Sequence, residues 1–186
     1  MSSLLRRVAP TSLPGCALAW LTLTACGGAA TPAARWDATE RARIDAELSG
    51  CDFFEEEAQH AAGYACDLGT LRAYDLSAPE DHAAVARRLA EAKAQEPVTA
   101  PLHEFAAREP IVFGDATFAS SIATYLPEEG TIIPPEVFLI ASPEHAGRQA
   151  YSCAVTLLAG LDTGEALAAR ISACVDGLRL LYEASR

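Results

Sequence analysis

The clearest hydrophobic pattern lies near the C-terminus, where apolar residues recur at steps of three and four. The stripe consists of Leu167, Ile171, Cys174, Val175, Leu178, Leu181 and Tyr182. Such steps bring side chains onto one face of an α-helix. Asp162 and Glu165 stand three residues apart just before the stripe, which is the spacing of a capping box. We therefore predict an α-helix from about Asp162 to the C-terminus.

A second helical pattern precedes this one. Ser142 suits an N-cap, Pro143 the first helical position, and Glu144 the positive end of a helix dipole. The stripe that follows consists of Ala146, Ala150, Cys153, Ala154, Leu157, Leu158 and Leu161. A short turn at 160–163 would fold the two helices back on each other as an antiparallel hairpin.

Two further helices are predicted in the first half of the chain. One spans Ser77 to about Gln95, with Ser77 and Glu80 as a capping box. The other spans about Asp37 to Ser49 and ends at Gly50. A separate stripe also has helical spacing; it consists of Phe54, Ala58, Ala61, Ala65 and Leu68.

The middle of the chain, residues 101–141, has no single period. Ile111–Phe113, Thr131–Ile133 and Val137–Ile140 have the composition of short strands, whereas Thr117–Leu126 also fits a helix. Alanine, the best helix former, is abundant elsewhere. The sequence thus predicts a mainly α fold: a small helical domain with a C-terminal helical hairpin and at most a minor β element in the middle.

The first 25 residues have the features of an export signal. Arg6 and Arg7 precede an apolar stretch from Leu13 to Ala25, and no acidic residue occurs before Asp37. The stretch is shorter than the roughly 20 apolar residues of a membrane-spanning helix. It ends in Leu23-Thr24-Ala25-Cys26. This sequence resembles the lipobox of bacterial lipoproteins, which implies cleavage before Cys26 and lipidation of its thiol.

The resemblance divides the chain into three parts. These are a signal peptide (1–25), a lipidated flexible tether (26–35) and a single helical domain (36–186). All 25 acidic residues but only 12 of the 14 basic residues follow Cys26, giving the mature chain a formal net charge of −13. Such a chain lacks the basic surface that nucleic acids require, and anionic lipid headgroups repel it. We therefore expect the lipid on Cys26 alone to hold it at a membrane.

Four cysteines remain beyond Cys26, and an even number in an exported chain indicates two disulfides. Cys153 and Cys174 lie at the same height above the turn of the predicted hairpin, so we predict that they are bonded. Cys51 and Cys66 are then left to pair. On one unbroken helix they would stand about 22 Å apart at 1.5 Å per residue. This pair therefore requires a break, expected at Gly63; without it both thiols stay free.

No catalytic constellation is evident among the polar residues. Of the four histidines, His60, His82, His103 and His145, only His103 begins a zinc-site pattern, and Ala107 stands where the second ligand should be. His82 lies on an apolar stripe; we interpret it as a boundary histidine rather than a ligand or acid–base group. The run Glu55–Glu57 is interpreted as a solvated acidic face. We predict no catalytic, metal-binding or cofactor-binding residues.

The aromatic residues of the first half can form a core or a binding surface. We interpret Phe53, Phe54, Tyr64 and Tyr74 as core, because large side chains must fill what neighbouring alanines leave open.

The expected function is that of a membrane-anchored lipoprotein of the bacterial cell envelope, a non-enzymatic interaction or structural module with an envelope protein as partner. The alternative is an envelope enzyme or enzyme inhibitor whose site is built from distant residues. Gly27 replaces the aspartate that retains some lipoproteins at the inner membrane. The resemblance therefore favours an outer membrane, where two membranes are present, with the domain facing the periplasm or exterior.

Overall fold

Antiparallel strands form one sheet at the centre of the structure, a computed structural model that describes residues 36–67, 69–157 and 164–186. Each described strand pairs only with its neighbours in the sheet. Their order across it is β1 (Asp52–Glu56), β2 (Ala61–Cys66), β3 (Gly69–Glu80), β7 (Gly147–Thr156), β6 (Glu136–Ser142), β5 (Ala116–Tyr125) and β4 (Leu102–Phe113).

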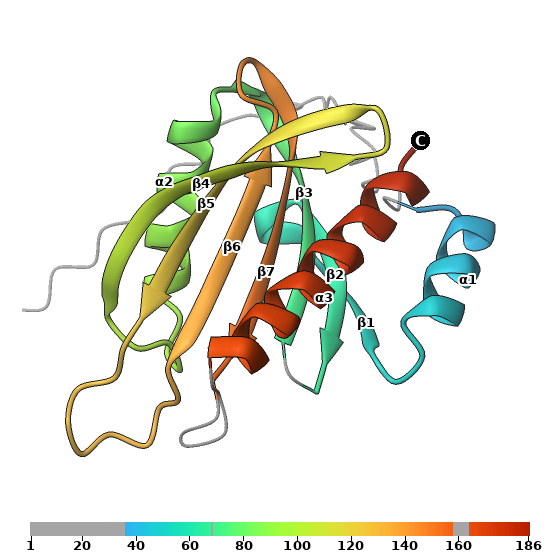
Figure 1. Ribbon diagram of the computed structural model, residues 1–186. Helices are drawn as coiled ribbons and strands as arrows, with labels where there is room; N and C mark the ends of the chain where they lie inside the picture. Colours follow the sequence, from blue (N-terminus) through green and yellow to red (C-terminus); the bar gives the residue numbers. More distant parts are fainter. Residues whose placement is uncertain (1–35, 68, 158–163) are drawn as a thin grey trace, which may run out of the picture. The chain divides into compact units, whose positions relative to one another are not determined.

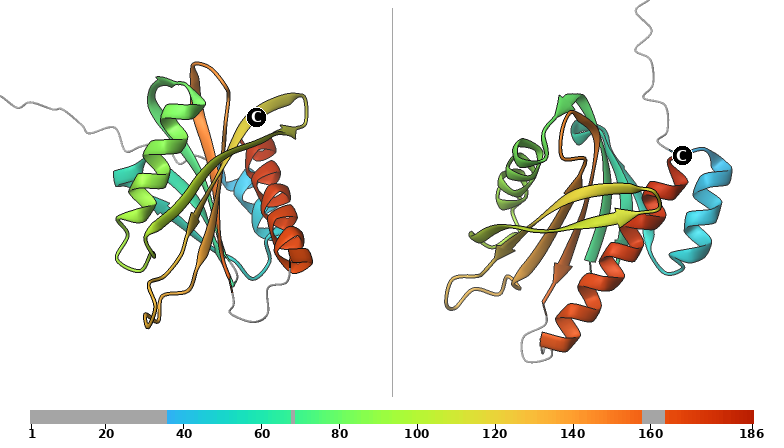
Figure 2. Two further views of the ribbon diagram at one scale, coloured as in Figure 1. Left: turned by 60° about the vertical axis from the view of Figure 1, so that its left-hand side comes forward. Right: turned by 45° about the horizontal axis from the view of Figure 1, so that its top comes forward.

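Helices cover both faces of this sheet. The helix α2 (His82–Ala94) packs on one face, while α3 (Gly164–Ala184) crosses the other diagonally with α1 (Ala38–Glu47) beside its C-terminal end (Figures 1 and 2). A single 3₁₀ turn, η1 (Glu57–Gln59), joins β1 to β2. The result is a layer of helix, a layer of sheet and a second layer of helix.

The side chains of each strand alternate between two cores. On β3, Leu71 and Ala73 face α3, while Tyr74 and Leu76 face α2. The α3-side core also holds an aromatic group of Phe113, Phe118, Tyr151 and Tyr182. Because both faces are covered, the inner strands β6 and β7 are buried at nearly every position.

The prediction of a mainly α fold is therefore wrong. The described part of the segment 142–161, which was expected to be a helix, contains instead the end of β6, a tight turn at 143–146 and the strand β7. Its alanines pack closely in the sheet, with Ala150 and Ala154 fully or almost fully buried. A continuous buried run has no polar face to set its period, so a strand covered on both sides also fits a helical stripe. The predicted helical hairpin does not exist.

The segment after α1 is a β-hairpin rather than the helix that its stripe indicates. Gly63, the expected break, lies in the middle of β2 opposite Arg72, and the chain turns back at η1 and His60 instead. A Cβ at Gly63 would overlap the carbonyl oxygen of Leu71. Glycine is thus needed here for close strand contact and not for a turn.

Three helices lie where the sequence predicts them. In α1, Asp37 accepts from the backbone of Thr39 and Glu40, and Glu40 closes the capping box. The helix α2 begins at His82 with Asp81 as its N-cap, later than predicted, because Ser77–Glu80 still belong to β3. The C-terminal helix is present as α3, and its predicted cap at Asp162 lies outside the described residues.

The middle of the chain is entirely strand and loop. Ile111–Phe113 ends β4 and Val137–Ile140 lies within β6, as predicted. Thr117–Leu126, which also fitted a helix, is almost wholly β5, and Thr131–Ile133 belongs to the loop before β6 rather than to a strand. Within the described ranges, no helix has the length and apolarity needed to cross a bilayer.

Both predicted disulfide pairings are present, although neither lies in the helical setting that the sequence predicts. Cys51 and Cys66 flank the β1–β2 pair and lie opposite each other, with Cα atoms 4.3 Å apart. Cys153 and Cys174 are 6.0 Å apart, but this bond joins α3 to the central strand β7, not two helices.

Candidate functional site

His82 is the one histidine of the described chain that is buried. Its Nδ1 lies 2.8 Å from Oγ of Ser142 and its Nε2 lies 2.9 Å from Oγ of Ser121. Desolvation lowers the pKa of this imidazole below its ordinary value of 6.5. No carboxylate completes a triad with the ring and either serine among the described hydrogen bonds, so the arrangement satisfies a buried histidine.

The lowered pKa of His82 makes stability depend on pH. The unfolded chain protonates this ring at a higher pH than the folded protein does, so stability gained above about pH 6.5 is lost as the pH falls through the folded pKa. We expect His82→Gln to flatten the dependence of the unfolding free energy on pH between 7.5 and 5. Urea titrations of both proteins measure it; an unchanged slope would contradict the assignment.

The other histidines are exposed, and none of them bonds to the ring of His82 among the described contacts. His60 occupies a left-handed turn position, His103 is exposed on β4, and His145 is exposed beside Asp81 and Glu144. In the part of the chain that the structure describes, no three His, Cys, Asp or Glu side chains form a group that could hold a metal ion.

A chain of ion pairs runs beneath the C-terminal end of α2. Lys93 lies 2.7 Å from Glu96 and 3.1 Å from Glu136, and its side chain is only 8% exposed. Arg72 pairs with Glu56 at 3.2 Å and approaches Glu96 at 3.9 Å. The sequence interpretation of Glu55–Glu57 as a solvated face thus misses Glu56, which lies half-buried against Arg72.

Two tyrosines complete this polar layer. The Tyr74 hydroxyl lies 3.1 Å from Oγ of Ser152, and the Tyr125 hydroxyl donates to the carbonyl of Ala90 at 2.8 Å. Burial raises the pKa of both phenols, so they stay neutral. Each charged group has at least one protein partner, although Oε2 of Glu56 and Nε of Arg72 are buried without a hydrogen bond. The layer joins α2 to the sheet.

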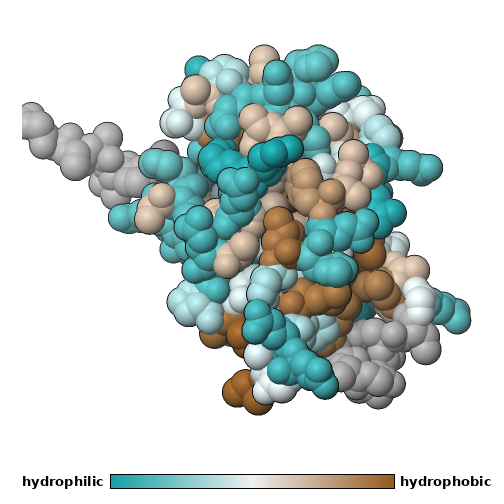
Figure 3. Space-filling view, turned by 90° about the vertical axis from the view of Figure 1, so that its left-hand side faces the viewer, coloured by the Kyte–Doolittle hydropathy of each residue, from teal (hydrophilic) through white to brown (hydrophobic). Residues whose placement is uncertain are grey.

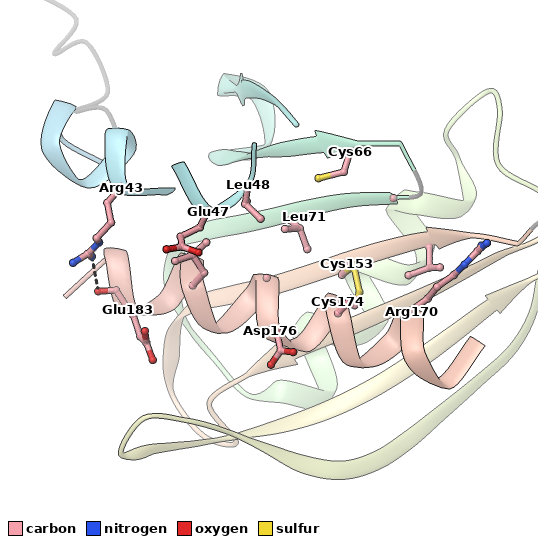
Figure 4. A pocket seen from close by; sticks show the side chains of 15 residues that line it. Arg43, Glu47, Leu48, Cys66, Leu71, Cys153, Arg170, Cys174, Asp176 and Glu183 are labelled. Carbon is pink, nitrogen blue, oxygen red and sulfur yellow. Dashed lines mark hydrogen bonds between the residues drawn. A yellow bond between two sulfur atoms is a disulfide. The ribbon is translucent and has the colours of Figure 1, made fainter. Parts of the chain in front are cut away.

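An open groove lies on the opposite face, between α1, the sheet and α3 (Figure 4). Its volume is about 810 Å³, within the range of small-molecule sites. Its lining residues come from distant parts of the sequence. They are Arg43, Glu47, Leu48, Cys66, Gly69, Leu71, Cys153, Val155, Arg170, Ala173, Cys174, Asp176, Gly177, Leu180 and Glu183.

The floor of the groove is apolar and fixed. Leu71 and Val155 form it together with the Cys153–Cys174 disulfide, and all four residues are buried. Gly177 lets α3 lie close to the sheet, because a Cβ there would stand 2.6 Å from Cδ1 of Leu71. The disulfide and this contact hold α3 in place, so the floor is preformed.

The rim of the groove carries both signs of charge. At one end Arg43 of α1 donates to the carbonyl of Glu183 at 3.5 Å, and Glu47 lies beside it (Figure 4). At the other end Arg170 donates to the carbonyl of Thr156 at 3.0 Å. An apolar floor between charged ends suits a ligand that is apolar along its length and polar at one end.

The sequence did not single out this groove. Of the predicted site residues, Cys66, Cys153 and Cys174 line it, Cys51 forms the bond behind Cys66, and Cys26 lies outside the described residues. Phe53 and Tyr64 pack with Trp36, and Tyr74 lies in the α2-side core, as their interpretation as core requires. No protein-family model, curated protein or solved structure matches the chain.

Proposed function

We propose that this protein is an exported lipoprotein, anchored through Cys26 in the bacterial cell envelope, that binds a single-chain amphiphile in the groove between α1 and α3. The observation that carries the proposal is the preformed groove, with its apolar floor and charged ends. The protein acts as a binding module. No described contact favours the alternative of an envelope enzyme or enzyme inhibitor over it.

The groove has the length of one acyl chain. Arg170 and Glu183 mark its ends on α3 and stand thirteen residues apart, which is about 20 Å at roughly 1.5 Å per residue. The hydrocarbon core of a bilayer is about 30 Å thick, so the chains of one leaflet span about 15 Å. An acyl chain along the floor therefore leaves room for a head group at one end.

The chain enters the domain near the C-terminal end of α3, which is the Arg43 end of the groove. Trp36 follows the predicted tether directly, and its Nε1 donates to Oγ of Ser185 at 2.9 Å, two residues beyond Glu183. Ten tether residues reach at most about 35 Å. A lipid on Cys26 would therefore keep the Arg43 end of the groove close to a membrane, where amphiphiles are concentrated.

Both charges of the rim act on the head group. Arg43 offers further guanidinium donors to a phosphate, while Glu47 and Glu183 attract a cationic amine. A head group that carries both charges, as in a lysophospholipid, is therefore favoured over a bare carboxylate, which the two glutamates repel.

Filling the groove should weaken binding strongly. Ala173 is exposed on the groove face of α3, and a tryptophan there would occupy the acyl-chain path. We expect Ala173→Trp to weaken the binding of lysophosphatidylcholine at least about tenfold, measured by calorimetry below micelle-forming concentrations. The lipid-free chain from Gly27 suits this measurement, because it keeps the whole compact unit Pro32–Arg186.

Ala168→Trp is the matched control. Ala168 is equally exposed on α3 but does not line the groove, so this variant should bind like the wild type. Equal binding by both variants, or none by the wild type, would contradict the proposal. Tighter binding of palmitate than of lysophosphatidylcholine would contradict the assignment of the head group.

The anchor has its own test. Two acyl chains hold a protein stably at a membrane, and the acidic mature chain has no electrostatic attraction to replace them. We expect Cys26→Ser to move the protein from the membrane fraction to the soluble fraction of the producing cells. Retention at the membrane in undiminished amount would refute lipid anchoring, without bearing on the groove.

A further inference from the structure

Exposed apolar side chains lie near the start of β4, in the segment before it and in the segment that follows β5. Of the six exposed large apolar residues in the described part of the chain, five lie here; we call them the β4 patch: Val98, Leu102, Phe105, Leu126 and Ile132. Val98 is 75% exposed and Ile132 fully exposed. On this side of the molecule, apolar atoms collect in the lower half, below a polar upper half (Figure 3).

The register of the strands brings these residues together. Phe105 pairs with Ala123 of the α2-side core, and Leu102 pairs with Tyr125. The backbone N–H of Leu126 donates to the carbonyl of Pro101 at 3.1 Å, which places Leu126 opposite Pro101, next to the Leu102–Tyr125 pair. The helix α2 packs mainly on β5 and β6 and less on β4, and the side chains of Leu102 and Phe105 remain exposed.

The strand that carries the patch is an open edge. Among the described strands β4 pairs with β5 alone, so the outward backbone groups of β4 have no strand partner. Its register is regular from Glu104 to Arg108, between one shift at Leu102/Glu104 and another at Arg108/Ile111. Pro110 lies in the second shift and disfavours pairing of the far half. The segment available for strand addition is therefore Glu104–Arg108.

The charges around the patch select the occupant. Glu128 and Glu129 lie in the loop between Leu126 and Ile132, and Glu104 projects from the opposite face of β4. All three are exposed, and they outnumber Arg108, the exposed base at the end of the same segment. These acids, with a net charge of −11 over the whole sequence, oppose pairing with a second copy of this chain. They favour a partner with basic residues.

We propose that the β4 edge binds an extended, basic segment of a partner protein, which adds to the sheet as a further strand. Its apolar side chains alternate onto Phe105 and Leu102, and its basic side chains meet Glu104 on the other face. The added main-chain hydrogen bonds supply affinity, and the alternation supplies specificity. This surface lies on the opposite face of the sheet from the groove, and it does not depend on the groove being a ligand site.

A peptide of alternating lysine and leucine, labelled with a fluorophore, is the probe. Fluorescence anisotropy with the lipid-free chain should show saturable binding, and amide signals of Glu104–Arg108 should shift in NMR spectra. We expect Phe105→Asp to weaken binding at least about tenfold. Val112→Asp is the matched control, because Val112 is an exposed apolar residue on the same strand beyond Pro110, and the change in charge is identical.

Further variants and binding assays distinguish strand addition by a basic peptide from simple charge attraction, dimerisation and lipid binding. Glu104→Lys should weaken binding of the lysine–leucine peptide and allow a glutamate–leucine peptide to bind. Equal weakening by Phe105→Asp and Val112→Asp would show charge attraction alone and overturn the proposal. Dimers of the wild type that Phe105→Asp dissociates in sedimentation would instead assign the edge to a second copy, and Phe105-dependent binding to zwitterionic vesicles would assign it to a lipid surface. Either result overturns the proposal.

Discussion

Replacing Lys93 with methionine should lower the free energy of unfolding by about 3–5 kcal/mol, the usual result of removing one partner from a buried ion pair. Methionine keeps the apolar stem but leaves Glu136, itself only 14% exposed, without the ammonium that lies 3.1 Å away. Small domains are stable by about 5–15 kcal/mol in total. Urea denaturation followed by circular dichroism measures the loss.

A second substitution separates the lost ion pair from lost packing. In Lys93→Met/Glu136→Leu both charges of this pair are gone, and an apolar pair of similar size is often as stable as the buried ions. Glu96 loses Lys93 as well, but it is 29% exposed and keeps Arg72 at 3.9 Å. We expect the double variant to recover much of the stability that the single variant loses. Arg179→Met is the surface control: its pair with Asp176, 3.0 Å long, is largely exposed, and its loss should cost at most about 1 kcal/mol. A similarly small cost for Lys93→Met would show that the buried network does not hold α2 to the sheet.

Removing the Cys153–Cys174 disulfide, by replacing both residues with alanine, should lower the free energy of unfolding by about 3 kcal/mol. The bond closes a loop with a sequence separation of 21 residues, and the loop entropy that it removes from the unfolded chain has this size. Because it also ties α3 to β7 at the floor of the groove, we expect faster amide exchange in α3 and weaker amphiphile binding.

The second disulfide provides the comparison. Cys51–Cys66 closes a loop of similar length, so its loss should cost a similar unfolding free energy while α3 exchange stays slow. Chemical denaturation and hydrogen exchange of both double-alanine variants give the two quantities. A cost below about 1 kcal/mol for Cys153→Ala/Cys174→Ala, or unchanged exchange in α3, would contradict the role given to this bond.

The helices were predictable because each exposes one face to water. The exposed residues of α1 and α2 break the apolar run at helical intervals, and Asp37 and Asp81 mark where the helices begin. The strand β7 offered no such signal, since Ala150–Val155 are all buried between two helical layers. The alanines of this strand, Ala150 and Ala154, have high helix propensity but are also small enough to pack between two helical layers, so their identity did not distinguish a strand from a helix.

The disulfide pairs were predictable and the groove was not. The pair Cys153–Cys174 was predicted from the equal distance of both residues from an expected turn, and Cys51–Cys66 was then the remaining pair. The reversal of the chain that the second pair requires is present, at η1 rather than at Gly63. The groove depends on Arg43, Leu71, Val155 and Ala173, which only the strand order and the diagonal path of α3 bring together. No local sequence motif predicts such a site, because it is formed by ordinary apolar side chains that come from separate elements of the fold.

The position of a bound amphiphile tests the central claim most directly. A lysophospholipid with a nitroxide near the methyl end of its chain broadens the NMR signals of amides close to it. Broadening should centre on Leu71, Val155 and Gly177 and spare α2, and Ala173→Trp should abolish it while Ala168→Trp leaves it intact. Broadening centred on α2 or the β4 patch, or none at saturating ligand, would contradict the assignment of the groove as the binding site.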